Sequence, residues 1–287
     1  MTQNNNLSVL PFYNNIEQQN HRKGYAYGAI YPLFAPANIL LPFQIMRETR
    51  TNQITKIVLY DKLGNYIADL TQQMKETGLQ IVRFENLGYD IIVFPAILPM
   101  ATNMFDGIYY LSISDGIGTW FSEMFTIVQD VKPYLKIEWW DSDNCVFDSG
   151  QIVYKNPNFK NCLYLLTELG KPEYPFEEES ETRNGYTFAT KQISVKTYKS
   201  TILAPEYMCD VMRLIRMADF VRITDKYGNE YYADTFLITP KWQTQGDLAS
   251  VEIEFTNNTV VKKNGLGYVR PTLGDFNIDY NDDFKNN

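Results

Sequence analysis

Apolar and polar residues alternate with a period of two along much of this chain. The stretches 135–139 and 251–255 each place three apolar side chains at alternate positions, with Lys or Glu between them. A period of two sends successive side chains to opposite faces of a β-strand, so both stretches are typical of strands with one buried face. The pattern predicts a mainly β protein.

Turn residues separate these alternating stretches. Two turns, at 61–65 and 225–229, share the sequence Asp-Lys-x-Gly-Asn. Gly and Asn favour the positive φ angles of tight hairpin turns, so each turn predicts a β-hairpin. A duplication would explain the repeat, but shared hairpin chemistry explains five residues equally well. A further hairpin, predicted across 108–128, closes the first half of the chain.

The pattern divides the chain into four parts. Residues 1–24 are rich in Asn and Gln and residues 263–287 are polar, so we expect an arm and a tail that are ordered only against a neighbour. Between them we expect an immunoglobulin-like β-sandwich at 25–130 and a second β domain at 131–262. The second domain contains the single predicted helix, 205–217, which begins with a proline and has one apolar face.

Composition argues against nucleic acid and membranes as binding partners. The net charge is −8 and no run of Lys or Arg occurs, so we expect no specific nucleic-acid binding. No apolar stretch is long enough to cross a bilayer, so we expect no membrane span. The three cysteines are widely spaced and form no CxxC pair, which favours synthesis in a reducing cytoplasm.

Residues able to carry catalysis are scarce. The single histidine, His21, lies in the predicted arm, and the chain has neither zinc-ligand spacing nor a phosphate-binding glycine-rich loop. The acidic segment 141–148 lacks the Gly and Glu that a calcium-binding loop needs at its sixth and twelfth positions. We therefore expect no enzyme, no cofactor and no bound metal.

Three groups of residues are candidates for contact with partners. Isolated apolar residues in the arm and the tail suit docking into a partner's pockets, and they are Leu10, Phe12, Tyr13, Phe276, Tyr280 and Phe284. The acidic run Glu177, Glu178 and Glu179 follows a proline-rich segment, which predicts a solvated loop able to meet a basic neighbouring subunit. Trp140 shares a strand face with polar residues and is expected to be an exposed ring.

The second half of the chain resembles structural proteins of tailed bacteriophages, especially those that infect Bacteroidetes. The resemblance covers roughly residues 105–262 and rests on the following segments: strand 193–203, helix 205–217, strands 220–224 and 231–238, the loop at 240–242, strand 249–255, and the stretches 169–179 and 246–252. It implies the β-sandwich-plus-helix fold of tail-tube and distal-tail proteins.

The resemblance also implies a function. Such a protein would be part of the virion, in the tail or at the head-to-tail connection, and would form a multi-subunit ring around the DNA channel. Its partners would be copies of itself and other tail or neck proteins. The alternative is a carbohydrate-binding or receptor-binding β-sandwich on a virion or cell surface, with Trp140 as the ring that stacks on a sugar.

Overall fold

The computed structural model describes residues 8–19, 33–37, 39–84, 88–94, 105–141, 160–183, 185–242 and 248–264. Strands make up 59% of these residues and helices 10%, so the prediction of a mainly β protein is confirmed. The described strands form one sheet of 14 strands and a second sheet of three. The helix predicted at 205–217 is present as α3, which spans Glu206–Ile215.

The N-terminal half contributes many short strands. Its elements are β1 (Phe12–Tyr13), η1 (Ile16–Gln18), β2 (Phe34–Pro36), β3 (Phe43–Glu48), β4 (Lys56–Asp61), β5 (Tyr66–Asp69), α2 (Thr71–Glu76), β6 (Gln80–Phe84), β7 (Tyr89–Phe94), β8 (Gly107–Ser114), β9 (Thr119–Ser122) and β10 (Phe125–Val128). Strands β3, β7 and β6 form the small sheet in that order. The other strands belong to the large sheet, where β8 pairs with β4, β9 and β10.

The C-terminal half has fewer strands, and three of them are long. Its elements are β11 (Leu135–Trp140), β12 (Asn161–Leu165), β13 (Phe176–Arg183), β14 (Tyr186–Pro205), α3, β15 (Phe220–Thr224), β16 (Glu230–Trp242) and β17 (Leu248–Asn264). They continue the large sheet in the order β12-β11-β15-β16-β17-β14-β13. β15 and β16 form the hairpin that the second Asp-Lys-x-Gly-Asn turn predicts.

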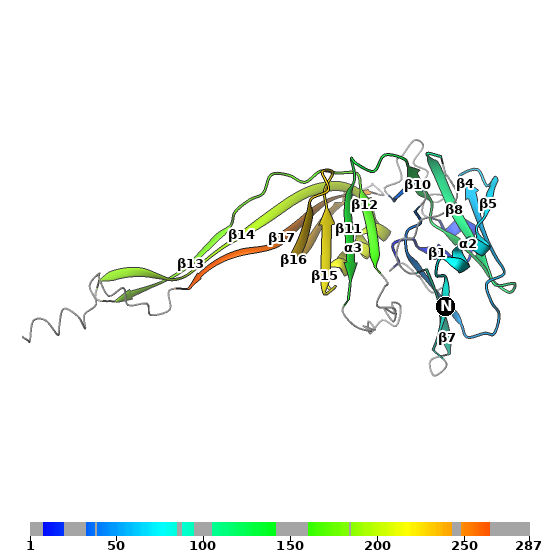
Figure 1. Cartoon of the computed structure of the whole chain (residues 1–287), viewed down its shortest axis with the longest axis horizontal. Coiled ribbons are helices and arrows are strands. Elements are labelled where there is room, and N and C mark those ends of the chain that lie inside the picture. Colours follow the sequence, from blue (N-terminus) through cyan, green and yellow to red (C-terminus); the bar gives the residue numbers. More distant parts are fainter. Residues whose placement is uncertain are drawn as a thin grey trace, which may run out of the picture.

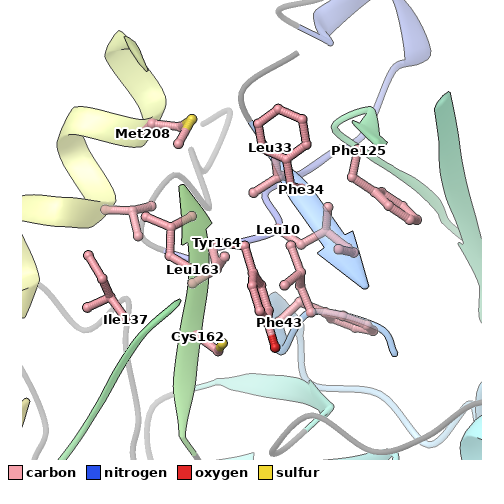
Figure 2. Close-up of a cluster of buried hydrophobic side chains, with 14 of the residues drawn as sticks. Leu10, Leu33, Phe34, Phe43, Phe125, Ile137, Cys162, Leu163, Tyr164 and Met208 are labelled. Carbon is pink, nitrogen blue, oxygen red and sulfur yellow. The ribbon is translucent and has the colours of Figure 1, made fainter. Parts of the chain in front are cut away.

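The large sheet runs without a break between the two halves. β2 pairs in parallel with β10 on one side, and on the other side Phe34 pairs with Tyr164 of β12. The boundary predicted at 130/131 falls between β10 and β11, next to this junction. Figure 2 shows the buried side chains there, with Leu33 and Phe34 from one half beside Leu163 and Tyr164 from the other. The buried residues of both halves belong to one hydrophobic cluster.

The segment 8–19 packs against its own chain. β1 pairs antiparallel with β9, and Leu10 and Phe12 are 0% and 1% exposed. The Phe12 ring centroid lies 4.7 Å from that of Phe43, and Leu10 lies within the same group of buried side chains (Figure 2). The prediction that this part of the arm is ordered only by a neighbour is therefore wrong. Burial is inferred from the alternation of apolar and polar residues along a strand, and a strand of two residues is too short to show it.

α3 covers one face of the long strands. Pro205 precedes the helix in an extended conformation, with φ −74° and ψ 166°. The buried face of α3 includes Met208, Val211, Met212 and Ile215, and the helix contacts β14, β16 and β17. We call the face of the sheet that carries the buried side chains of these strands, such as Val251, the core-side face.

Candidate functional site

Three strands leave the compact part of the molecule as a narrow projection. Figure 1 shows β13 and the outer parts of β14 and β17 extending together, away from the N-terminal half. We call the residues 176–183, 185–196 and 257–264 the ribbon, and the remaining described residues the body. β14 has 20 residues and β17 has 17, whereas the strands of the N-terminal half have two to eight, so the ribbon arises from continuation of body strands.

The ribbon is held by two antiparallel ladders. β13 pairs with β14 from Phe176↔Ser194 outward, and β14 pairs with β17 from Ser194↔Val261 outward. The pairing of β14 with β17 is irregular between Ser194 and Lys196, where the ribbon meets the body. Irregularities of this kind bend a strand and increase its local twist, which suits a sheet that changes direction on leaving its core.

The acidic run lies on a strand and not in the loop that was predicted. Glu177, Glu178 and Glu179 are exposed residues of β13, the last strand of the sheet. Gln192 donates a hydrogen bond to Glu178 over 2.7 Å, and Lys191 forms an ion pair of 2.8 Å with Glu179. Consecutive acidic residues hide the alternation by which strands are recognised. Charged side chains are nevertheless common on edge strands, because they oppose uncontrolled pairing.

The core-side face of the sheet continues onto the ribbon, where its side chains are no longer buried. Tyr198 of β14 is buried in the body, and the Nζ atom of Lys196, two residues further out, lies 5.3 Å from the centroid of its ring. The next residue on this face is Ser194, which pairs with Phe176 and Val261. These two side chains are 59% and 71% exposed. Two large apolar side chains therefore face solvent in one row.

Both edges of the ribbon are open within the described part of the chain. β13 ends the sheet, and β16 accompanies β17 only as far as Asn257. An open edge presents unpaired backbone N–H and C=O groups, which are ready to pair with another strand. The β13 edge is acidic, whereas Lys262 is exposed on the β17 edge. The two edges thus differ in the sign of their charge.

Two lysines at the ribbon and its base are held in their charged form by ion pairs. A hydrogen bond to Glu179 raises the pKa of Lys191 above its ordinary value of 10.5. Next to the ribbon, Lys199 lies 2.9 Å from Glu173, and the hydrogen bond between them raises the pKa of Lys199 in the same direction. The lysines therefore keep their positive charge across the neutral range.

Trp140 lies on the body, away from the ribbon, and is half-buried. Phe220 of β15 stacks on it with 5.6 Å between ring centroids and 18° between ring planes. The Nζ atom of Lys160, which precedes β12, lies 4.6 Å from the Trp140 centroid. The indole therefore has neighbours from both sides of β11, since β12 and β15 flank that strand. The ring is thus half-buried among these neighbours and not the exposed ring that was expected.

The structure does not gather the predicted site residues into one place. Tyr13 joins Leu10 and Phe12 in the core, where it donates a hydrogen bond of 3.2 Å to the buried Glu123. Phe276, Tyr280 and Phe284 lie outside the described residues. The acidic run alone falls on the ribbon.

Sequence reasoning missed Phe176, Val261 and Lys262. The predicted strands at 193–203 and 249–255 continue in the structure to 186–205 and 248–264, beyond the alternation from which they were predicted. The described side chains of the extensions that lie in the ribbon are exposed or half-buried, so hydrophobic alternation ends where the ribbon begins.

Other kinds of site find no support in the described ranges. No group of three or more His, Cys, Asp or Glu side chains there is placed to hold a metal ion. No helix in the same ranges is long and apolar enough to span a bilayer. Comparisons with protein-family models, with curated proteins and with solved structures found no match.

Proposed function

We propose that this protein is a structural component of a tailed-bacteriophage virion, without enzymatic activity. In this proposal many copies form a ring around the DNA channel, in the tail or at the head-to-tail connection. The observation that carries the proposal is the ribbon, with its two open edges and exposed apolar row. Isolated β-ribbons are marginally stable in water, so this one fits a protein that completes itself against a neighbour.

The proposed fold is finer than a mainly β architecture. We propose an immunoglobulin-like sandwich in the N-terminal half and a domain similar to tail-tube and distal-tail proteins in the C-terminal half. The order of β14, α3, β15, β16 and β17 supports the second assignment, because it follows the element order on which the sequence resemblance rests. The packing of α3 on these long strands fits a sandwich-plus-helix domain.

Charge is compatible with a channel component. With a net charge of −8, the protein lacks the clustered positive charge that holds nucleic acid without regard to sequence. DNA would pass such a surface without adhering to it. The partners proposed are therefore other proteins, namely further copies of this chain and neighbouring tail or neck proteins.

The proposal is tested with the purified full-length chain. Mass photometry over a range of concentrations should show a closed multi-copy species, and cryo-EM class averages should show rings. Mass spectrometry of purified phage particles that encode the protein should detect it in several copies per virion. A protein that stays monomeric at all concentrations and is missing from the particles would rule the proposal out.

A further inference from the structure

We propose that successive copies join through their ribbons, with β13 of one copy pairing in parallel with residues 261–264 of β17 in the next. This inference rests on the proposed ring and names the contact that builds it. The occupant of each open edge is a second copy of this chain. The argument comes from strand direction, from pairing register and from the charges on the two edges.

Strand direction sets the geometry of the contact. β13 and β17 are each antiparallel to β14, so they point the same way. Copies related by rotation about a ring axis keep the same strand direction relative to that axis. The acidic edge of one ribbon can therefore lie along the basic edge of the next only as a parallel pair, whose evenly spaced hydrogen bonds are an ordinary way to extend a sheet.

The register within one copy shows which residues would meet. Phe176 and Val261 occupy one row across the ribbon, because both pair with Ser194. Glu177 and Lys262 occupy the next row, because both pair with Ile193.

If the rows continue unshifted into the next copy, Val261 comes to lie beside the neighbour's Phe176. Lys262 then lies beside the neighbour's Glu177, and the backbone position of Lys263 falls beside Glu178. One apolar contact and one pair of opposite charge thus come into register together.

Other registers lose this match. A shift of one residue turns every side chain of one ribbon to the opposite face, so the apolar side chains no longer meet. A shift of two residues places Glu178 beside Val261, or Phe176 beside Lys263. Either arrangement sets a charge against an apolar residue. The unshifted register is therefore the one that the residues favour.

The same charges oppose symmetric pairing of two copies. A two-fold contact between β13 edges would bring the acidic runs of both copies together. A two-fold contact between β17 edges would bring Lys262 of one copy towards Lys262 of the other. Like charges on facing strands are destabilising. The edges therefore favour a head-to-tail contact, which repeats from copy to copy and closes into a ring when the rotation permits.

A designed disulfide tests the register. Within one copy, positions 176 and 261 are two strands apart, or about 10 Å, whereas a disulfide needs Cα atoms within about 7 Å. The pair Phe176→Cys and Val261→Cys should therefore crosslink between copies, giving an oxidation-dependent ladder of multimers on denaturing gels. The matched control is Thr182→Cys with Val261→Cys, which is six residues out of register and should give no ladder. Each single-cysteine variant controls for the native cysteines.

Charge reversal tests the same contact without a covalent bond. Glu177→Lys and Lys262→Glu should each weaken subunit association roughly fivefold or more, since each turns an attraction into a repulsion. The double variant restores the pair in reversed order and should regain most of the wild-type association. Glu76→Lys makes the same change of net charge as Glu177→Lys at an exposed position of α2, and it should leave association unaltered.

The outcomes separate this inference from the proposed function. Rings that form normally while the 176/261 ladder is absent and the reversals have no effect would overturn the pairing and leave the ring proposal intact. A wild-type chain that never assembles would overturn both. A ladder from the matched pair together with rescue by the double reversal would establish the contact.

Discussion

At the residue scale, the most demanding group in the core is Arg47 on β3. Its guanidinium lies 2.6 Å from Asp115 and 3.5 Å from Asp90, and it donates a further hydrogen bond to the backbone oxygen of Asn52. The side chains of Arg47, Asp90 and Asp115 are all 0% exposed. Such charges persist in a core only when they are paired and hydrogen-bonded. This cluster ties the small sheet to the turn between β8 and β9.

Replacing Arg47 should lower the stability of the folded protein. Arg47→Met fills similar volume but removes the buried guanidinium from two buried carboxylates and leaves them only Arg50, which is partly exposed. The free energy of unfolding should therefore fall by about 3–5 kcal/mol. Urea denaturation followed by fluorescence measures this loss. Arg213→Met is the matched control, because Arg213 is exposed and pairs with Asp210 at the surface; its cost should stay below about 1 kcal/mol. Equal effects of the two substitutions would contradict the proposed role of the cluster.

The same cluster predicts how stability depends on pH. Burial raises the pKa of the Asp115 carboxyl, but hydrogen bonds from two backbone N–H groups and from Arg47 outweigh burial and hold this pKa below its ordinary value of 3.8. The unfolded state therefore binds a proton more readily than the folded state does. The stabilisation is complete above about pH 5 and is lost as the pH falls through and below about 4.

Denaturation midpoints measured between pH 3 and pH 7 check this dependence. The midpoint should fall at acid pH in the wild type, and it should fall less steeply in Asp115→Asn, which has no carboxyl to protonate at this position. An identical slope in both proteins would show that Asp115 does not contribute.

At the element scale, the segment 8–19 is part of the fold and not a free arm. Leu10→Ala should lower the free energy of unfolding by about 2–5 kcal/mol, the usual cost of a cavity left by a fully buried leucine. Leu63→Ala is a matched control, because Leu63 is 77% exposed at a hairpin tip and surface substitutions change stability by about 0.5 kcal/mol or less. Limited proteolysis of the isolated protein should likewise spare residues 8–19. Rapid cleavage of this segment, together with an unchanged free energy of unfolding in Leu10→Ala, would show that the segment is an arm ordered only by a neighbour.

Several elements followed from sequence because their chemistry is local. Both Asp-Lys-x-Gly-Asn turns form as predicted, and in each the Asp carboxylate accepts hydrogen bonds from the same three donors of the turn. Gly64 and Gly228 have φ of 87° and 82°, which explains the glycine at that place. α3 followed from its apolar face and the preceding proline. The shared chemistry is sufficient to explain the repeated turn.

Elements whose stability depends on distant partners were harder to predict. The two residues of β1 are fixed by pairing with β9, which lies more than 100 residues away along the chain, and no local pattern can show that. β13 carries consecutive glutamates because it is an edge strand, and this position depends on sheet order and not on its own composition. The candidate site was therefore predicted only in part. The acidic run was singled out, but its strand conformation and the basic Lys262 on the other edge were not predicted.

At the scale of the whole molecule, body and ribbon have different sources of stability. The body buries the apolar side chains of both halves in one cluster. The described side chains of the ribbon are exposed or half-buried, so its backbone hydrogen bonds receive little support from hydrophobic burial. Regions with few buried contacts open at low free-energy cost. The ribbon thus adds little to the stability of a single subunit, and the proposed contact between subunits would account for its length.

Shortening the ribbon should therefore separate folding from assembly. Phe176 and Ser194 face each other across the β13–β14 ladder, so an Asn-Gly turn can replace residues 177–193 without moving either end. The shortened protein should keep a free energy of unfolding within about 1 kcal/mol of the wild type, because the replaced side chains lie outside the fully buried core. It should nevertheless fail to form multimers in mass photometry. Normal multimers from the shortened chain would show that the ribbon does not join the subunits, and a large loss of stability would show that it belongs to the core of the fold.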